Sequence, residues 1–520
     1  MFRTNLKFAI RNLRNHQRHA LLNIAGLSVA IAACLVIYLV VDHEYSFDTY
    51  HQHAKQVFQI VKKETTPDGD AYSVATPLPM TAALRADFPG VIFSELFNSY
   101  GSQVTVMSDA RKDSDKKFVE KTGVFYADPA LFECFDVNWL AGNRSVLTNN
   151  NVAVLSRSVA DKYFGTWQEA MGKFIKIDNT VTAQVAGIIG DPPANTDFPF
   201  AVVVSYRSFD THLAELGFAG MKDQWGAATS NHQVYALLPE SVSATAIDQG
   251  FRNFVPKYLR PHLNKSQQVQ IFLQPLRNIH FDTRFNNNGT HISSKTSLNT
   301  LAFIGLLILL MACINFVNLS TALSVKRSKE VGIRKVMGSS SGQLAGQVFW
   351  ETFLLVCLSA IVALGLAYFS LPYLKYLVQI ENRLPLFRPW NMVFLALVIA
   401  LTTLLSAIYP AMVLSRFQPI EAMRNKVNTS KLGSLSLRRV LVVIQFCFSQ
   451  ILIIATIIAL RQMYYVQNAD LGFNKASIVL LHGNNDSASI ARLDAFKKSL
   501  LAIPGVQDVS CSFDPPSSGN

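Results

Sequence analysis

The sequence predicts an α-helical membrane protein with five spans and a large extracytoplasmic domain of mixed α/β structure. Its 520 residues are 50% hydrophobic and only 16% charged, whereas ordinary soluble chains carry about 25% charged residues. The chain contains five apolar runs, each near the roughly 20 residues that a helix needs to cross a bilayer core. The net charge of +12 gathers in short segments that flank these runs.

The five apolar runs define the expected spans. They are Leu21–Val41, Leu301–Leu319, Phe353–Leu371, Met392–Leu414 and Val440–Leu460. Buried helices of soluble proteins more often have apolar runs of about 10–14 residues, so the five longer runs favour spans. A cleaved signal peptide is the alternative for the first run. Its apolar sequence continues past Cys34, so an uncleaved anchor is predicted.

Basic residues assign the two sides of the membrane. The net charge is +5 in residues 1–19, +4 in residues 323–346, +5 in residues 415–439 and −2 in residues 43–297. Because Lys and Arg are retained on the cytoplasmic side, the N-terminus and both short basic loops are expected in the cytoplasm. Residues 43–297, 372–391 and 461–520 are then outside. Basic residues that flank spans also argue against nucleic-acid binding, which needs one basic soluble face.

Residues 43–297 have the composition of a mixed α/β domain and are too many for an unstructured loop. A helix is expected from Thr76-Pro77 to about Asp87, because Thr can cap a helix and Pro suits its first turn. A second helix is expected at Ser156–Tyr163, capped by Ser156 and ended before Gly165. Short strands are predicted at Val57–Val61, Gln103–Met107, Val152–Leu155, Ile175–Ile177 and Thr182–Ile189.

An internal repeat is suggested by features that recur in the same order. Each copy has a basic stretch, a span, an aromatic turn, a short strand and a helix that ends in Pro-Gly-Val. The two copies pair Arg11–Arg14 with Leu437–Arg439, Tyr45–Asp48 with Leu471–Asn474, Val57–Val61 with Ile478–Leu481, and Pro89–Val91 with Pro504–Val506. The second copy is therefore expected to begin an outside domain within residues 461–520.

The sequence lacks the signatures of several kinds of chemical site. It has no P-loop, HExxH or GxSxG motif, and its six cysteines show no CxxC spacing. No catalytic residue, cofactor or metal site is predicted on these grounds. His280 and Asp282 are interpreted as a surface hydrogen-bonded pair rather than a catalytic dyad. Asn315 and Asn318, within the second span, are expected to bond across helices, and a substrate pathway is the alternative.

The segment Ser324–Glu351 is the most specific part of the chain. Apolar residues from Val325 to Met337 alternate with basic residues at helical spacing, which predicts a short basic helix along the cytoplasmic membrane face. Gly338 suits a left-handed C-cap, and Ser339–Ser341 can cap the next helix. Topology and lipid headgroups alone would account for the charges. A docking element for a cytoplasmic partner is the sharper interpretation, and composition does not separate the two.

Within this segment, the run RSKEVGIRKVMGSS at residues 327–340 closely resembles a signature of MacB/FtsX-type ABC transporter permeases. That signature is R-x-K-E-[IV]-G-[IL]-R-[KR]-[AV]-x-G-[AS]-[ST], and here, as in that family, it lies between the second and third spans. Gln418–Arg424 resembles the family's P-x-x-A-L-R motif, and Tyr409–Ala411 resembles the end of its fourth span. Three segments resemble successive parts of its MacB-like periplasmic core domain: Val124–Asn143, Val152–Gly165 and Met171–Pro193.

The fifth span and the restarted outside domain resemble the duplicated, eight-span permeases common in Bacteroidota. On that resemblance the chain is truncated, and three spans and a second loop motif would lie beyond Asn520. The domains expected are a cytoplasmic amphipathic helix (1–20), a first span (21–42), a MacB-like periplasmic core domain (43–297), a second span (298–322), a cytoplasmic coupling loop (323–346), a third span (347–371), a fourth span (392–414), a cytoplasmic basic linker (415–439), a fifth span (440–460) and the start of a second periplasmic domain (461–520).

The resemblance implies a non-enzymatic subunit of the bacterial inner membrane that works with a separate cytoplasmic ABC ATPase. It would transmit ATP-driven conformational change to its periplasmic domain for efflux or export, without a channel through the membrane. The residues implied in ATPase coupling are Lys329, Glu330, Gly332, Arg334, Lys335 and Gly338. Glu330 and the basic residues would pair with ATPase charges, and the two glycines would permit close approach and a sharp turn.

The resemblance also implies further partners and leaves alternatives open. The partners are membrane lipids, a periplasmic adaptor or other periplasmic protein, and a second permease half in a dimer or pseudo-dimer. The amphipathic stretch Asn5–His19 would lie on the inner leaflet. One alternative keeps the fold but makes the protein an ABC-coupled signalling protein or regulator of a cell-wall hydrolase, with no transported cargo. A membrane-tethered sensor without an ATPase is a third hypothesis, which the loop motif disfavours.

Overall fold

The computed structural model divides into two compact units. The helical unit comprises Met1–Tyr45 and Lys295–Asn474, and the sheet unit comprises Ser46–Ser294 and Lys475–Asn520. Each is described by itself. The structure describes all residues except 1–10, 12–16, 108–115, 122, 265, 286–290, 327, 377–383, 416–433, 471–477, 482, 484–486 and 513–520.

Five helices of the helical unit are long and apolar enough to cross a membrane. They are α2 (Gln17–Tyr45), α10 (Lys295–Lys326), α12 (Ser341–Ser370), α13 (Pro389–Ser415) and α15 (Ser434–Asn468). Each contains one of the apolar runs in the sequence, apart from Leu371, which follows α12, and this confirms the five predicted spans. Two short helices complete the unit: α11 (Ser328–Val336) and the 3₁₀ helix η5 (Leu371–Tyr376).

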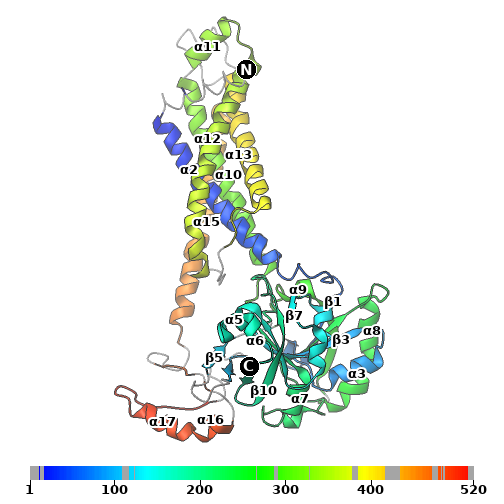
Figure 1. Cartoon of the computed structure of the whole chain (residues 1–520). Coiled ribbons are helices and arrows are strands. Elements are labelled where there is room, and N and C mark those ends of the chain that lie inside the picture. The colour runs from blue at the N-terminus through cyan, green and yellow to red at the C-terminus, as the bar shows by residue number, and fades with distance from the viewer. Residues whose placement is uncertain are drawn as a thin grey trace. The chain divides into compact units, whose positions relative to one another are not determined.

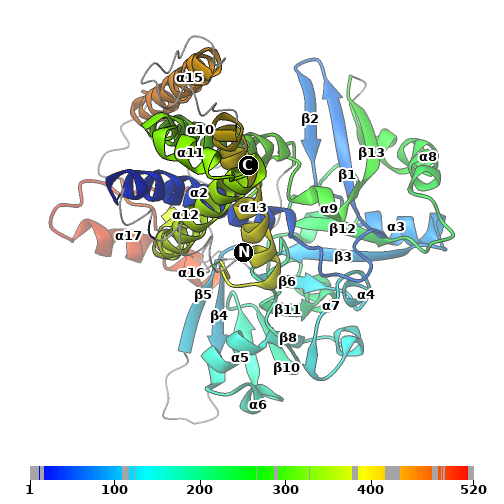
Figure 2. The same cartoon turned by 90° about the horizontal axis from the view of Figure 1, so that it is seen from above.

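Four of the long helices form one bundle. Figure 1 shows α2, α10, α12 and α13 side by side, and Figure 2 shows them end on. Helix α2 packs against α10 and α12, and α13 packs against the same two helices. Ile31 on α2 and Val356 on α12 are fully buried in the shared core, next to Phe316 on α10. Helix α15 packs against α10.

Helices α2 and α10 approach closely at Gly305. A Cβ atom at this position would lie 3.3 Å from Cδ1 and 3.4 Å from Cγ2 of Ile37. Small residues at such crossings let the backbones of membrane helices approach each other. Gly305 therefore sets the spacing of this helix pair.

The sheet unit is built on a 13-stranded sheet in the order β13-β1-β12-β3-β6-β11-β8-β10-β9-β4-β5, with β2 beside β1 and β7 beside β10. Its strands are β1 (Val57–Thr66), β2 (Gly69–Ser73), β3 (Ile92–Asn98), β4 (Ser102–Val106), β5 (Lys116–Glu120), β6 (Val124–Ala127), β7 (Trp139–Ala141), β8 (Val152–Ser156), β9 (Phe174–Ile177), β10 (Val181–Ile189), β11 (Val202–Ser205), β12 (His232–Leu237) and β13 (Gln268–Pro275). The pairs β10–β8 and β11–β6 are parallel, and the other pairs are antiparallel.

Short helices cover the two ends of this sheet. Figure 2 shows α3 and α8 with β1 and β13, and α5 and α6 with β8 and β10. The short helices of the sheet unit as a whole are α3 (Met80–Asp87), α4 (Leu131–Cys134), α5 (Arg157–Phe164), α6 (Trp167–Ala170), α7 (Tyr206–Thr211), α8 (Ala244–Phe254), the π-helix η3 (Val255–Leu259), α9 (Leu276–Ile279), α16 (Ser487–Ala491) and α17 (Leu493–Leu501), and its 3₁₀ helices are η1 (Arg144–Thr148), η2 (Ala219–Met221) and η4 (Arg260–His262).

The first and last strands of the domain lie next to each other. Strand β1 pairs with β13 over eight residues, from Phe58 opposite Pro275 to Thr65 opposite Gln268. The face of this pair that carries Ile60 and Ile271 is covered by α3, α8 and η3, where Met80, Phe251 and Leu259 are buried. This covered face forms one of the hydrophobic cores of the sheet unit.

The five predicted strands of the sheet unit are confirmed, with ends that differ by a few residues, and so is the helix before Gly165. Gly165 has a φ of 90°, as a helix end requires. Ser156 stands at the N-cap of α5, but its side chain makes no capping hydrogen bond.

The predicted start of the first helix is wrong. Helix α3 begins at Met80, not at Thr76. The backbone N–H and the hydroxyl of Thr76 both donate to the carbonyl of His232, at 3.2 and 2.9 Å. Thr76 is thus bonded at the start of β12, and this long-range pairing overrides its local helix-capping preference.

The predicted second copy differs in one of its described elements, and its predicted turn, Leu471–Asn474, lies outside the described residues. Residues 478–481 form no strand, since they pair with no strand in the described chain, whereas α17 ends shortly before Pro504 as expected. The amphipathic stretch Asn5–His19 and the basic linker 415–439 lie mostly outside the described residues.

Candidate coupling loop

Helix α11 is fixed to the bundle through one apolar residue. Val331 is buried against Leu344 of α12 and Leu414 of α13, with Val348 packed beside them. Gly332, the next residue, is also buried. The loop is therefore attached to the ends of two spans rather than lying free.

A glycine-dependent turn ends α11. Gly338 has a φ of 96°, a conformation that costs a residue with a Cβ roughly 1–2 kcal/mol. The N–H of Gly338 donates to the carbonyl of Lys335, and the N–H of Ser339 donates to the carbonyl of Arg334, at 3.1 and 3.0 Å. This pair of bonds is a Schellman motif, so the C-cap predicted at Gly338 is confirmed.

A capping box starts the next helix at once. The Ser340 hydroxyl accepts from the N–H of Gln343, and the Gln343 side chain accepts from the N–H of Ser340. Such reciprocal bonds satisfy two N–H groups that a helix start otherwise leaves unpaired. Two defined caps within three residues make this turn a fixed corner between α11 and α12.

The apolar residues of α11 do not share one face, which corrects the predicted amphipathic helix. Val331 is 5% exposed, whereas Ile333, Val336 and Met337 are 47%, 65% and 74% exposed. The split arises because Val331 faces α12 and α13, and Ile333, two residues later, lies on nearly the opposite side of the helix. The corner therefore presents an apolar patch, Ile333, Val336 and Met337, which we call the loop patch.

The predicted coupling residues are only partly described. The Arg334 guanidinium donates to the side-chain oxygen of Gln347 on α12 at 3.0 Å, and Lys335 is half-buried. Arg334, Lys335 and Gly338 thus meet at the corner beside the loop patch. Lys329 and Glu330 belong to the first turn of α11, and their side chains lie outside the described set.

Asn318 supports the packing interpretation of the polar residues in the second span. Its side-chain amide donates to the side-chain oxygen of Gln445 at 3.4 Å and so joins α10 to α15. Asn315, three residues earlier, is exposed.

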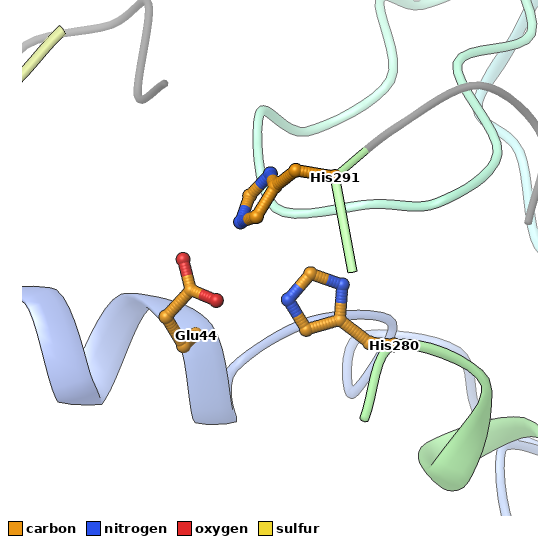
Figure 3. Close-up of side chains that lie close together, drawn as sticks. All are labelled: Glu44, His280 and His291. Carbon is orange, nitrogen blue, oxygen red and sulfur yellow. The ribbon is translucent and has the colours of Figure 1, made fainter. Parts of the chain in front are cut away.

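The predicted surface pair of His280 and Asp282 is wrong. His280 is 2% exposed, and its Nδ1 lies 3.1 Å from a carboxylate oxygen of Asp197, which is fully buried. Asp282 instead binds the guanidinium of Arg284 at 2.9 and 2.7 Å. Figure 3 shows the His280 ring beside that of His291, edge to face with centroids 5.1 Å apart. Sequence spacing gave no signal for this arrangement, because Asp197 is 83 residues from His280.

Asp48 extends this buried network to the start of the sheet unit. Its carboxylate accepts from the Thr196 hydroxyl and from the N–H of Asp197, and its own N–H donates to the carbonyl of Asn195. Burial, and then the neighbouring Asp197 carboxylate, raises the pKa of Asp48 well above its ordinary range. The chain that leaves α2 is therefore bonded to the 195–197 loop within three residues of entering the sheet unit.

Comparison with known proteins identifies two regions. The family model for the MacB-like periplasmic core domain matches residues 20–254, and the model for the FtsX-like permease C-terminal region matches residues 302–419. Among solved structures, the chain is similar to "a domain of a putative Permease protein" from Porphyromonas gingivalis. The identity is 16%, the TM-score is 0.36, and the match covers 49% of this chain and 99% of that chain. No curated protein matches.

The two family matches occur in the order expected for one permease. The first match covers α2 and most of the sheet unit, and the second match covers most of α10 together with α11, α12 and α13. The corner formed by Arg334, Lys335 and Gly338 lies within the second match. The chain therefore belongs to the MacB/FtsX-type ABC transporter permeases.

Proposed function

We propose that this permease transmits ATP-driven conformational change from a separate cytoplasmic ATPase to its extracytoplasmic sheet unit, for efflux or export. The corner between α11 and α12 carries this proposal. It is held to two spans through Val331, it is fixed by two helix caps, and it presents the loop patch beside Arg334 and Lys335.

This arrangement suits a contact that must transmit motion. Interface hot spots combine an apolar anchor with charged residues such as arginine, and the loop patch with its two cations has this composition. The contact of Val331 with Leu344 and Leu414 provides a route for displacement into α12 and α13. A push on the loop patch would reach both spans without a flexible connection.

The first experiment is a paired charge reversal. The full-length tagged chain is purified from native membranes, and a co-purified polypeptide that carries an ABC ATPase P-loop is identified by mass spectrometry. We expect Arg334→Glu with Lys335→Glu to reduce the recovered ATPase at least tenfold. Arg388→Glu is the matched control, because Arg388 is exposed and lies in the segment between the third and fourth spans.

A second variant separates docking from folding of the loop. Met337→Asp changes a side chain that is 74% exposed, so it leaves the two helix caps in place. We expect it to weaken ATPase recovery while the thermal stability of the permease is unchanged. ATPase recovery equal to wild type in both variants would rule out the corner as the coupling surface.

The direction of coupling is tested by hydrogen exchange. Adding a non-hydrolysable ATP analogue to the purified complex should change amide exchange in the sheet unit, and the double charge reversal should abolish that change. An exchange response confined to the ATPase would contradict transmission. If the sheet unit responds but deletion of the gene changes no export, the output is the signalling or cell-wall-regulating alternative.

A further inference from the structure

A cavity of about 280 Å³ lies against the sheet face of β1 and β13. Ile60, Lys62 and Glu64 of β1 line its floor with Val269 and Ile271 of β13. These residues follow the two-residue period that places alternate side chains on one sheet face. The floor is therefore apolar at one end and charged at the other.

Two separate segments form the rest of the cavity. Trp225 lines one side and stacks on Tyr258 of η3, with ring centroids 4.9 Å apart and planes 21° apart. Another side is lined by Leu259, His262, Leu263, Asn264 and Gln267. The side-chain amide of Gln267 donates to Glu64 at 2.8 Å, and its side-chain oxygen accepts from the N–H of Asn264 at 3.0 Å. These hydrogen bonds join the wall of the cavity to its floor and keep the cavity open.

At the polar end of the cavity, the Lys62 ammonium makes no short hydrogen bond to any described residue, whereas Glu64 accepts one. Glu64 already accepts the Gln267 amide, whereas its distance to the Lys62 ammonium is 3.8 Å, longer than a hydrogen bond. His262 and Asn264 line the same cavity. The side chains of Lys62 and Glu64 keep 26% and 24% exposure, so a ligand can reach both.

We propose that this cavity binds a small apolar carboxylate. The hydrocarbon or aromatic body would lie against Ile60, Ile271 and Trp225, and the carboxylate would replace the long Lys62–Glu64 contact with a short bond to the Lys62 ammonium. Charge-assisted bonds of this kind are about twice as strong as neutral ones. The volume is just below the roughly 300–1,000 Å³ of pockets for drug-sized ligands, so the ligand is smaller than a drug. The proposal does not depend on coupling to an ATPase.

The test uses the full chain in lipid nanodiscs and 3-phenylpropionate as the probe, with binding followed by ligand-observed NMR. The cationic analogue 3-phenylpropylamine and the neutral 3-phenylpropanol are compared under the same conditions. We expect saturable binding of the carboxylate, at least tenfold tighter than of the amine. Equal or tighter binding of the amine, or no saturable binding of the carboxylate, would overturn the proposal.

Three variants locate the site. Lys62→Met should weaken carboxylate binding about tenfold. Lys63→Met is the matched control, because Lys63 is the next residue of β1, faces the opposite side of the sheet and pairs there with Asp70 at 2.7 Å; it should bind as wild type does. Glu64→Gln keeps an oxygen for Gln267 and removes the competing negative charge, so it should tighten carboxylate binding. Unchanged affinity in Lys62→Met, or weakened affinity in Glu64→Gln with the fold intact, would contradict the assignment.

Discussion

At the scale of single residues, the sheet unit depends on histidines that are buried in the neutral form. His232 is fully buried, and its Nδ1 lies 2.8 Å from the Thr76 hydroxyl. Burial lowers the pKa of His232 to about 4. His51 is 3% exposed, and its Nδ1 accepts from the N–H of Asp136. Burial lowers its pKa to about 4 as well. Both side chains must lose their buried, neutral state before they can take up a proton.

These shifts predict an acid-sensitive contribution to stability. A lowered folded-state pKa gives stability that is present above the unfolded value of about 6.5 and is lost as the pH falls toward 4. Between pH 7.5 and pH 5 the loss is roughly 2 kcal/mol for His232. His232→Asn should therefore have a lower free energy of unfolding than wild type at pH 7.5, and this difference should be smaller at pH 5. Chemical denaturation of the full chain at both pH values measures it.

Two comparisons keep this measurement specific. Asp48 has a raised pKa, so its contribution has the opposite sign and is lost as the pH rises. The contribution of Asp48 is present in both wild type and His232→Asn, so it cancels in the difference between their free energies of unfolding. His53→Gln, at an exposed position, is the matched control for the loss of one histidine. A His232→Asn difference that stays constant with pH would contradict the buried neutral state.

At the scale of helices and strands, the contact between α2 and α10 depends on the missing side chain of Gly305. Gly305→Leu would place atoms where Ile37 already lies, and overpacking of this kind typically costs about 1–3 kcal/mol. The variant should unfold at a lower temperature than wild type in the same detergent. Gly365→Leu on α12 is the control, since a Cβ there has no atom within 4 Å. Equal melting temperatures in the two variants would show that α2 and α10 do not approach closely here.

The elements also show where sequence patterns were sufficient. The five spans and five of the thirteen strands follow from periodicity and apolar length, because lipid and a half-buried sheet impose their constraints along the chain itself. The start of α3 could not be predicted, since Thr76 is committed to His232, 156 residues away. The partner of His280 could not be predicted for the same reason, because Asp197 is distant from it in the sequence. For the corner between α11 and α12, the motif predicted both caps, but not that Val331 faces inward while Met337 faces outward. The cavity at Lys62 gave no signal, because its walls come from distant segments.

At the scale of the whole molecule, the distribution of basic residues predicts the orientation of the permease. Single cysteines at Ser339 and Glu240, introduced after the six native cysteines are replaced, report the two sides. In spheroplasts, a membrane-impermeant maleimide should label the Glu240→Cys protein at once and the Ser339→Cys protein only after permeabilisation. The reverse pattern would place the N-terminus outside and contradict the charge argument.

The pairing of β1 with β13 has a mechanical consequence. The chain from α2 enters β1 at Val57, and the chain toward α10 leaves β13 at Pro275, so both connections meet the ladder at its Phe58–Pro275 end. Antiparallel ladder bonds run perpendicular to the strands. Tension that separates the two connections would therefore open these bonds one at a time, like a zipper, instead of shearing all eight residue pairs together. The bonds of Asp48 to the 195–197 loop precede that zipper on the α2 side, and they would bear such a load first.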